Sequence, residues 1–227
     1  MSTAVKDAFA RSRVTYTRMF WLFMLSSFAG VLLEGLFCLF RYGHWETHVV
    51  SLWGPFCIIY GIGAVGCYMG HALLGQKKKW VQFMAYSFVG FFVELICGSA
   101  LEYGLYMRAW DYSQHFMNIH GHVSMQMTVA WGFIGIVFSQ LAPWLDEMLS
   151  LLENRTMDMA CTALSVFMAV NLFMTAVAVG RWSRRHFEIP ASGGMDLWID
   201  ENYPDEFMEK RFCEWRFLGD EPEEASL

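Results

Sequence analysis

Charged side chains are scarce in this chain of 227 residues, where they make up 17% of the sequence against 56% for hydrophobic residues. A soluble domain usually has about 25% charged and 45–50% apolar residues, so this composition argues against one. The hydrophobic residues also form long blocks. About 20 apolar residues in a helix cross a hydrocarbon core of roughly 30 Å. The sequence therefore predicts a multi-pass protein of the cell membrane, embedded in the lipid bilayer.

Several chemical signatures are missing as well. The sequence has no P-loop, GxSxG, HExxH or kinase motif, so it has no P-loop of its own with which to hydrolyse ATP. The six cysteines form no CxxC pair, and five lie in apolar stretches, as buried small hydrophobes do. His120 and His122 lack partners for a tetrahedral metal site. We therefore predict no metal, no cofactor and, without a basic domain, no nucleic-acid partner.

Hydropathy predicts three regions: a basic N-terminal segment at 1–18, a membrane bundle at 19–181 and an acidic polar C-terminal tail at 182–227. The fold class is an all-α integral membrane bundle of about five transmembrane helices. These are expected at about 19–40, 52–74, 80–107, 124–141 and 159–179. Between the last two, leucines and methionines recur at helical spacing among acids, which predicts an amphipathic helix lying along the membrane interface.

Lysine and arginine near the ends of the spans predict the orientation. The N-terminal segment and the loop Lys77–Lys79 should share the cytoplasmic side, with Asp111 on the opposite side. The fifth span would then place Arg181, Arg184 and Arg185 outside, against the rule. The side of the tail therefore stays open at this point.

The sequence contains a degenerate internal repeat. The blocks 21–34 and 81–94 share six identical residues, at positions 23/83, 24/84, 27/87, 28/88, 30/90 and 34/94. The blocks 43–54 and 121–132 share a Gly-His start and a Trp-Gly end. Two units at about 19–75 and 80–142, each with two spans, predict a parallel repeat. We expect the third span to pack beside the first. A further helix at 159–179 follows the two units.

Glu34 and Glu94 are the most informative residues, because a carboxylate inside a span costs several kcal/mol. They indicate either a proton, cation or polar-substrate site, or carboxyls that hydrogen-bond a neighbouring helix. Glu94 should matter more than Glu34, since Glu102 and Asp111 continue a polar trail beyond it. For Asp111 and Ser113, capping of a turn or helix is the alternative.

Two further motifs carry a family resemblance. Residues 54–61 read Gly-Pro-Phe-Cys-Ile-Ile-Tyr-Gly, and residues 110–113 read Trp-Asp-Tyr-Ser, followed by Asn118 and Gly121. With Glu94 and Glu102, these resemble the bacterial ABC-transporter permease family of the CmpB type. The sequence departs from the family pattern at Ile58, at Ala109 and at 48–50.

The resemblance implies a transport component that works with a separate ATPase subunit. A membrane-embedded enzyme acting on a lipid or isoprenoid through Glu94, Glu102 and Asp111, or a non-catalytic assembly protein, are the alternatives, and self-association into a homo-oligomer stays open. The candidate site residues are Glu34, Tyr60, Glu94, Glu102, Trp110, Asp111, Tyr112, Ser113 and Asn118.

Overall fold

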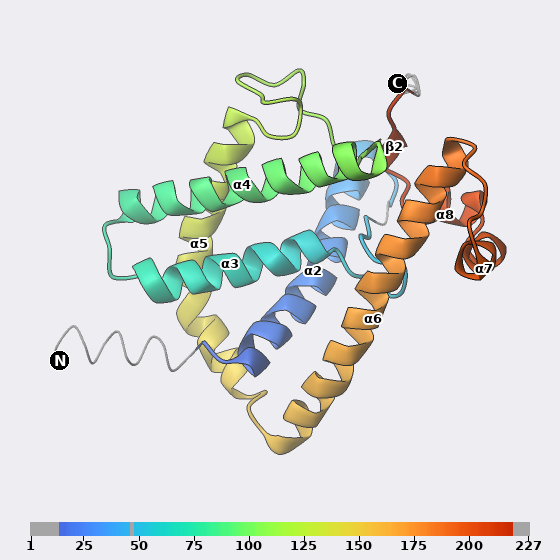
Figure 1. Ribbon diagram of the computed structural model, residues 1–227. Coiled ribbons are helices and arrows are strands. Elements are labelled where there is room, and N and C mark those ends of the chain that lie inside the picture. The colour runs from blue at the N-terminus through green and yellow to red at the C-terminus, as the bar shows by residue number, and fades with distance from the viewer. Residues whose placement is uncertain (1–13, 46–47, 220–227) are drawn as a thin grey trace.

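The computed structural model describes residues 14–45 and 48–219, so residues 1–13 of the predicted basic N-terminal segment lie outside it. Helices dominate the described chain (Figure 1). They are α2 (Tyr16–Tyr42), α3 (Ile58–Leu74), α4 (Lys79–Leu105), α5 (Met125–Ser150), α6 (Arg155–His186), α7 (Gly194–Asn202) and α8 (Asp205–Arg211). Two short strands, β1 (Met107–Arg108) and β2 (Arg216–Phe217), complete the described elements.

Helices α2, α4, α5 and α6 are long and apolar enough to cross a membrane, and α3 is a shorter apolar helix of 17 residues. At 1.5 Å per residue, α3 spans about 26 Å. The bundle exposes large apolar side chains such as Phe40, which is 87% exposed, while Gln82 and Asn171 are fully buried. Apolar surfaces outside, with buried polar side chains such as these two hydrogen-bonded inside, suit lipid as the solvent. The prediction of an all-α membrane bundle of about five helices is confirmed.

The first four of these helices form two antiparallel hairpins, α2 with α3 and α4 with α5, while α6 packs on α2. Figure 1 shows α3 and α4 side by side, where the two hairpins meet. Within the described residues α2 and α4 do not form a packed pair. The expectation that the third span packs beside the first is therefore wrong. From α2 to α5 each helix packs on its successor, as connected antiparallel helices usually do.

The second helix begins at Ile58, six residues later than the expected span at 52–74. The segment before it is irregular although it is apolar. Its backbone is satisfied by α6: the Leu52 amide donates to Thr175 Oγ1 (2.8 Å), and the Trp53 amide donates to Asn171 Oδ1 (3.0 Å). Asn171 Nδ2 donates in return to the Trp53 carbonyl (2.8 Å). Buried irregular backbone is tolerated in a membrane protein only with such partners.

Helix α5 is longer than the expected span at 124–141. It continues through Pro143 to Ser150, so the structure has one helix where a separate interfacial helix was expected. Leu149 explains the difference, because it is buried against Leu22 and Tyr68 of the bundle and does not face the membrane interface. Helix α6 likewise continues to His186, past the expected start of the tail at 182.

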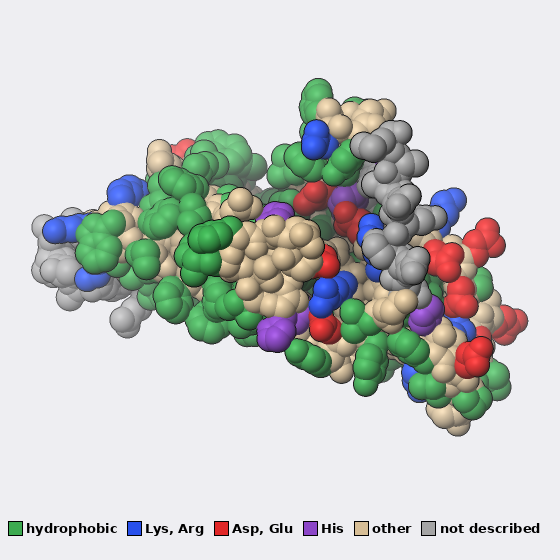
Figure 2. All heavy atoms as spheres, turned by 90° about the horizontal axis from the view of Figure 1, so that it is seen from above, with side chains coloured by type: hydrophobic (Ala, Val, Ile, Leu, Met, Phe, Trp, Pro, Cys, Tyr) green, Lys and Arg blue, Asp and Glu red, His purple; other side chains and the backbone are tan. Residues whose placement is uncertain are grey.

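The C-terminal segment folds back onto one end of the bundle. Strand β2 pairs antiparallel with β1, with Met107 opposite Phe217 and Arg108 opposite Arg216. Apolar side chains of α7 and α8, among them Met208, pack with Trp182 of α6 in one buried cluster. Figure 2 shows hydrophobic side chains covering one half of the view and acidic ones gathering in the other half, over this C-terminal segment.

Candidate functional site

A cavity of about 310 Å³ lies at the end of the bundle where the C-terminal segment docks. It is bounded by α2, by the start of α3, by α4, by the connection between α4 and α5, and by the first turns of α5. Residues 211–215 close it from the C-terminal segment. Five predicted site residues line the cavity: Glu34, Tyr60, Glu94, Trp110 and Tyr112.

The carboxylate of Glu34 is engaged on both oxygens. The Tyr60 hydroxyl donates a hydrogen bond to Oε1, and His48 Nδ1 lies 3.8 Å from Oε2. The same histidine nitrogen lies 2.8 Å from Oε1 of Glu214 in the C-terminal segment. Glu34 therefore belongs to a polar chain that joins α2, α3 and the segment that closes the cavity.

Glu94 is more buried and less satisfied, with 7% of its surface exposed. The indole nitrogen of Trp131 donates to Oε1 (3.0 Å). The other oxygen, Oε2, is buried and forms no hydrogen bond of normal geometry with the described residues, although the Tyr112 hydroxyl lies near enough to interact with this carboxylate. A buried carboxylate with a free oxygen is costly unless a ligand or a proton compensates it.

Each aromatic donor is positioned by a glycine on the preceding helix. A Cβ added to Gly30 would overlap the ring of Tyr60, and one added to Gly90 would overlap the ring of Trp131. Each glycine lies one helical turn before the glutamate of the same helix. Close approach of the helices at the glycine therefore brings the polar atom of the ring within hydrogen-bond reach of that glutamate.

Trp110 and Tyr112 belong to the connection between α4 and α5. The Trp110 indole nitrogen donates to the His122 carbonyl (2.8 Å), and the Tyr112 amide donates to the Gly121 carbonyl (2.8 Å). Burial raises the pKa of the Tyr112 hydroxyl, and the charges of Glu94 and Glu34 raise it further. Tyr112 therefore stays neutral beside both carboxylates over the physiological pH range.

Glu102 and Asp111 lie outside the residues that line the cavity. Glu102 Oε2 accepts hydrogen bonds from Arg108 Nε (2.8 Å) and lies 2.8 Å from His122 Nε2. Eight residues on a helix amount to about 80° of rotation beyond two turns, which turns Glu102 away from Glu94 and toward this arginine. Asp111 Oδ2 also accepts from Arg108 (3.2 Å).

The remaining two predicted residues order the same connection. The Ser113 amide donates to Asp111 Oδ1 (2.8 Å), and Asn118 Nδ2 donates to the Ser113 carbonyl (2.9 Å). The Gly121 amide donates to Asn118 Oδ1 (3.2 Å). Burial raises the pKa of Asp111, but the Ser113 hydrogen bonds and the Arg108 charge outweigh it and lower this pKa. The hydrogen bonds of Asp111, Ser113 and Asn118 therefore order the turn that carries Trp110 and Tyr112.

Sequence reasoning missed the part of the cavity that the C-terminal segment supplies. Arg211 Nε donates to the Ser51 carbonyl (3.0 Å), and its Nη2 donates to the carbonyls of Ser51 and Gly54. Glu214 and Trp215 line the cavity beside it. The available signal was the aromatic and acidic composition of the tail, which did not indicate where the tail docks.

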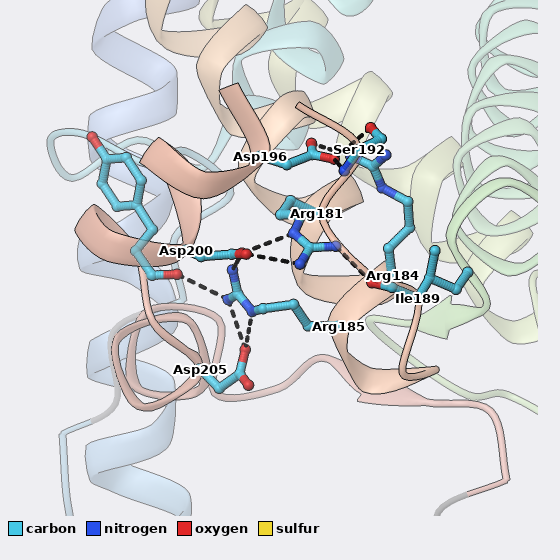
Figure 3. A network of polar contacts seen from close by, with 9 residues as sticks. Arg181, Arg184, Arg185, Ile189, Ser192, Asp196, Asp200 and Asp205 are labelled. Carbon is cyan, nitrogen blue, oxygen red and sulfur yellow. Dashed lines mark hydrogen bonds and ion pairs between the residues drawn. The ribbon is translucent and has the colours of Figure 1, made fainter. Parts of the chain in front are cut away.

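A network of arginines and aspartates holds the C-terminal segment in place (Figure 3). Arg181 Nε and Nη2 donate to the two oxygens of Asp200 (2.8 and 2.7 Å). Arg185 Nη1 donates to Asp200 as well (2.7 Å). The hydrogen bond from Arg181, followed by that from Arg185, lowers the pKa of Asp200 to about 2. Arg184 pairs in the same way with Asp196 (2.8 Å).

Apolar helices of membrane-spanning length around a polar-lined cavity define a multi-pass helical membrane protein. A family model described as "Putative ABC-transporter type IV" matches residues 21–176, and the chain belongs to this family. The resemblance stated from the motifs is thereby confirmed. No curated protein and no solved structure matches the chain.

Proposed function

We propose that the chain is the permease component of an ABC-type transport system in the cell membrane, and that the cavity is its substrate site. The observation that carries the proposal is the cavity itself, which places two span carboxylates of a family member, Glu34 and Glu94, in one compartment. Ionisable residues inside spans usually mark substrate or ion pathways. Tyr60, Trp110 and Tyr112 complete the proposed site.

The chain has no P-loop, so the proposal requires a separate ATPase subunit. We place its docking surface at the loop around Gln76–Lys79, which joins α3 to α4 at the end of α4 remote from Asp111. Lysines at this loop favour the cytoplasmic side, where ATP is found. The arginines of α6 lie at the other end of the bundle, where positive charge runs against this orientation. Their charges are paired with those of Asp196, Asp200 and Asp205, which weakens that objection.

We also infer that the two hairpins are copies of one unit. Besides the pairs Gly30–Tyr60 and Gly90–Trp131, a Cβ added to Gly61 would meet Ser27 and Phe23, and one added to Gly132 would meet Ser87 and Phe83. These matched contacts support the repeat in 21–34 and 81–94. They pair Gly61 with Gly132, whereas the motif comparison paired Gly54 with Gly132.

The geometry favours transport over the lipid-enzyme alternative. That alternative assigned acid–base roles to Glu94, Glu102 and Asp111 together. Glu102 and Asp111 instead share Arg108 and do not line the cavity with Glu94. General acid–base catalysis needs its groups within hydrogen-bond reach of one substrate.

The test is affinity purification of the full chain from its native membrane in mild detergent, followed by identification of co-purifying proteins. We expect an ATPase subunit with a P-loop. Replacing Lys77, Lys78 and Lys79 together by glutamate should abolish the association, while Lys210→Glu, at the other end of the bundle, should not. Purification of the chain alone, or only as a homo-oligomer, from membranes that contain the ATPases would contradict the proposal.

A further inference from the structure

The cavity combines carboxylates with an unusual density of aromatic side chains. Its aromatic residues come from four parts of the chain, namely α3, the connection between α4 and α5, α5 itself and the C-terminal segment: Tyr60, Trp110, Tyr112, Trp131, Phe212 and Trp215. We propose that the cavity binds a small organic ammonium ion, which is held between these rings and the free oxygen of Glu94. This inference rests on the proposed function, because it takes the bound ion to be the substrate that the permease transports.

The charge of the cavity selects for a cation. Among the described residues, three carboxylates line it, those of Glu34, Glu94 and Glu214, against one guanidinium, that of Arg211, and the imidazole of His48. Arg211 directs its hydrogen bonds at the carbonyls of Ser51 and Gly54, and His48 lies between Glu34 and Glu214. Glu94 has no cationic partner among the described residues, so the excess negative charge falls at this residue.

Glu94 also supplies a hydrogen-bond acceptor for the ligand, its oxygen Oε2. Trp131 occupies Oε1, whereas Oε2 is buried without a hydrogen-bond partner in the described part of the chain. Desolvation penalises an ionised carboxylate here, and a bound cation removes that penalty. The ion pair would form in a site largely shielded from water, where such a pair is strongest.

The aromatic residues select an organic cation over a metal ion. Alkylated ammonium groups bind aromatic faces through cation–π attraction and apolar contact at the same time. A hard cation such as Ca²⁺ requires six to eight oxygen ligands. The described residues contain no cluster of three or more metal-ligating side chains suited to an ion. Since Tyr60, Trp110 and Trp131 direct their polar atoms at protein groups, they have only their rings to offer a ligand.

The cavity volume fits a small ligand. About 310 Å³ lies at the lower end of the range for small-molecule pockets, which is roughly 300–1,000 Å³. A compact ion such as choline or tetramethylammonium is therefore a suitable probe. A long-chain lipid would have to leave most of its length outside.

The experiment is isothermal titration of the purified full chain, in detergent or nanodiscs, with choline, tetramethylammonium and 3,3-dimethylbutan-1-ol. The alcohol has the shape of choline but replaces nitrogen by carbon, so it isolates the charge. We expect at least one of the two cations to bind about tenfold or more tightly than the alcohol. Equal affinity for cations and alcohol, or binding of none of the three, would overturn the inference.

Variants locate the site. Glu94→Gln keeps the shape and an acceptor for Trp131 but removes the charge, so it should weaken cation binding about tenfold or more. Glu147→Gln on the exposed face of α5 removes a carboxylate outside the cavity and should leave the affinity unchanged. If Glu94→Gln elutes as a monodisperse peak and still binds cations as tightly as the unmodified chain, the assignment to this cavity is refuted.

The outcomes separate this inference from the proposed function. Cation binding is measured on the chain alone and needs no ATPase. Selective cation binding without a co-purifying ATPase would sustain the ligand assignment and reject the permease role. A co-purifying ATPase without selective cation binding would sustain the permease role and reject the ligand class.

Discussion

The hairpins α2–α3 and α4–α5 share a plan but differ at their carboxylates. In each, a glycine admits an aromatic ring from the next helix, and that ring donates a hydrogen bond to a glutamate. Glu34 has further contact with His48, whereas one oxygen of Glu94 has no hydrogen-bond partner within residues 14–45 and 48–219. The difference teaches that two glutamates in similar sequence contexts can differ in how fully the described side chains engage their oxygens.

The largest expected effect concerns the charge of the two acids. Glu94→Gln should weaken choline binding about tenfold or more, whereas Glu34→Gln should weaken it about threefold or less, since Glu34 already has protein partners. Titration calorimetry on both variants measures the ratio. An equal loss in the two variants would remove the proposed distinction between the hairpins. Glu94→Ala should also reduce the folded yield, because the Trp131 indole loses its acceptor.

The second effect concerns the fit of the helices. Gly90→Ala should destabilise the bundle by about 1–3 kcal/mol, because the new Cβ overlaps the Trp131 ring. Gly104→Ala on the same helix has open space around it and is the matched control, with unchanged or slightly raised stability. Thermal unfolding of the purified variants, followed by size exclusion, measures both. Unchanged thermal stability of Gly90→Ala would show that α4 and α5 are less closely packed than described.

The third effect concerns the aromatic donors. Trp131→Phe should destabilise the chain by about 1–2 kcal/mol, because it leaves a buried carboxylate without its remaining described hydrogen bond. Tyr60→Phe should have a smaller effect, since Glu34 keeps its contact with His48. The two are compared by the same unfolding measurement. A larger effect of Tyr60→Phe would reverse the order that we assign to the two hairpins.

The fourth effect concerns the C-terminal segment, whose Glu214 reaches the first hairpin through His48. Asp200→Asn should loosen this segment by about 1–2 kcal/mol, a moderate value because Asp200 is partly exposed. Limited proteolysis after α6 measures the loosening. Asp205→Asn, which leaves Arg185 its contact with Asp200, should loosen it less.

The same ion pair predicts a pH dependence. The pKa of Asp200 is lowered from 3.8 to about 2, so its stabilising contribution is fully present above about pH 4 and is lost as the pH falls through about 2. Docking of the segment should therefore be constant from neutral pH down to about pH 4. Release of the segment between pH 7 and pH 5 would show that another titrating group controls it.

The sequence was sufficient to predict the five apolar helices and the two span carboxylates, though not α7 and α8. Length and hydropathy decide a membrane helix, and an acid within a span stands out against apolar neighbours. The start of α3 was predicted too early because the irregular segment around Leu52 and Trp53 is as apolar as a helix. Its hydrogen bonds come from Asn171 and Thr175 of α6, more than 100 residues away.

The C-terminal part of the site lay beyond sequence reasoning for a related reason. Arginine–aspartate pairs such as Arg181–Asp200, and strands of two residues, leave no periodic pattern in a sequence. The sequence analysis grouped Glu102 with Glu94 as part of one polar trail. Its neighbour Arg108, which lies past the end of α4, redirects it, and the hydropathy profile contains no trace of that contact.

The position of residues 211–215 in the chain has a consequence for biogenesis. These residues close the cavity, yet they follow all five apolar helices in the order of synthesis. The helices therefore enter the membrane while the compartment around Glu94 is still open on one side. Until Arg211 reaches the carbonyls of Ser51 and Gly54, the newly inserted bundle lacks the side chains that close the cavity over its carboxylates and aromatic rings.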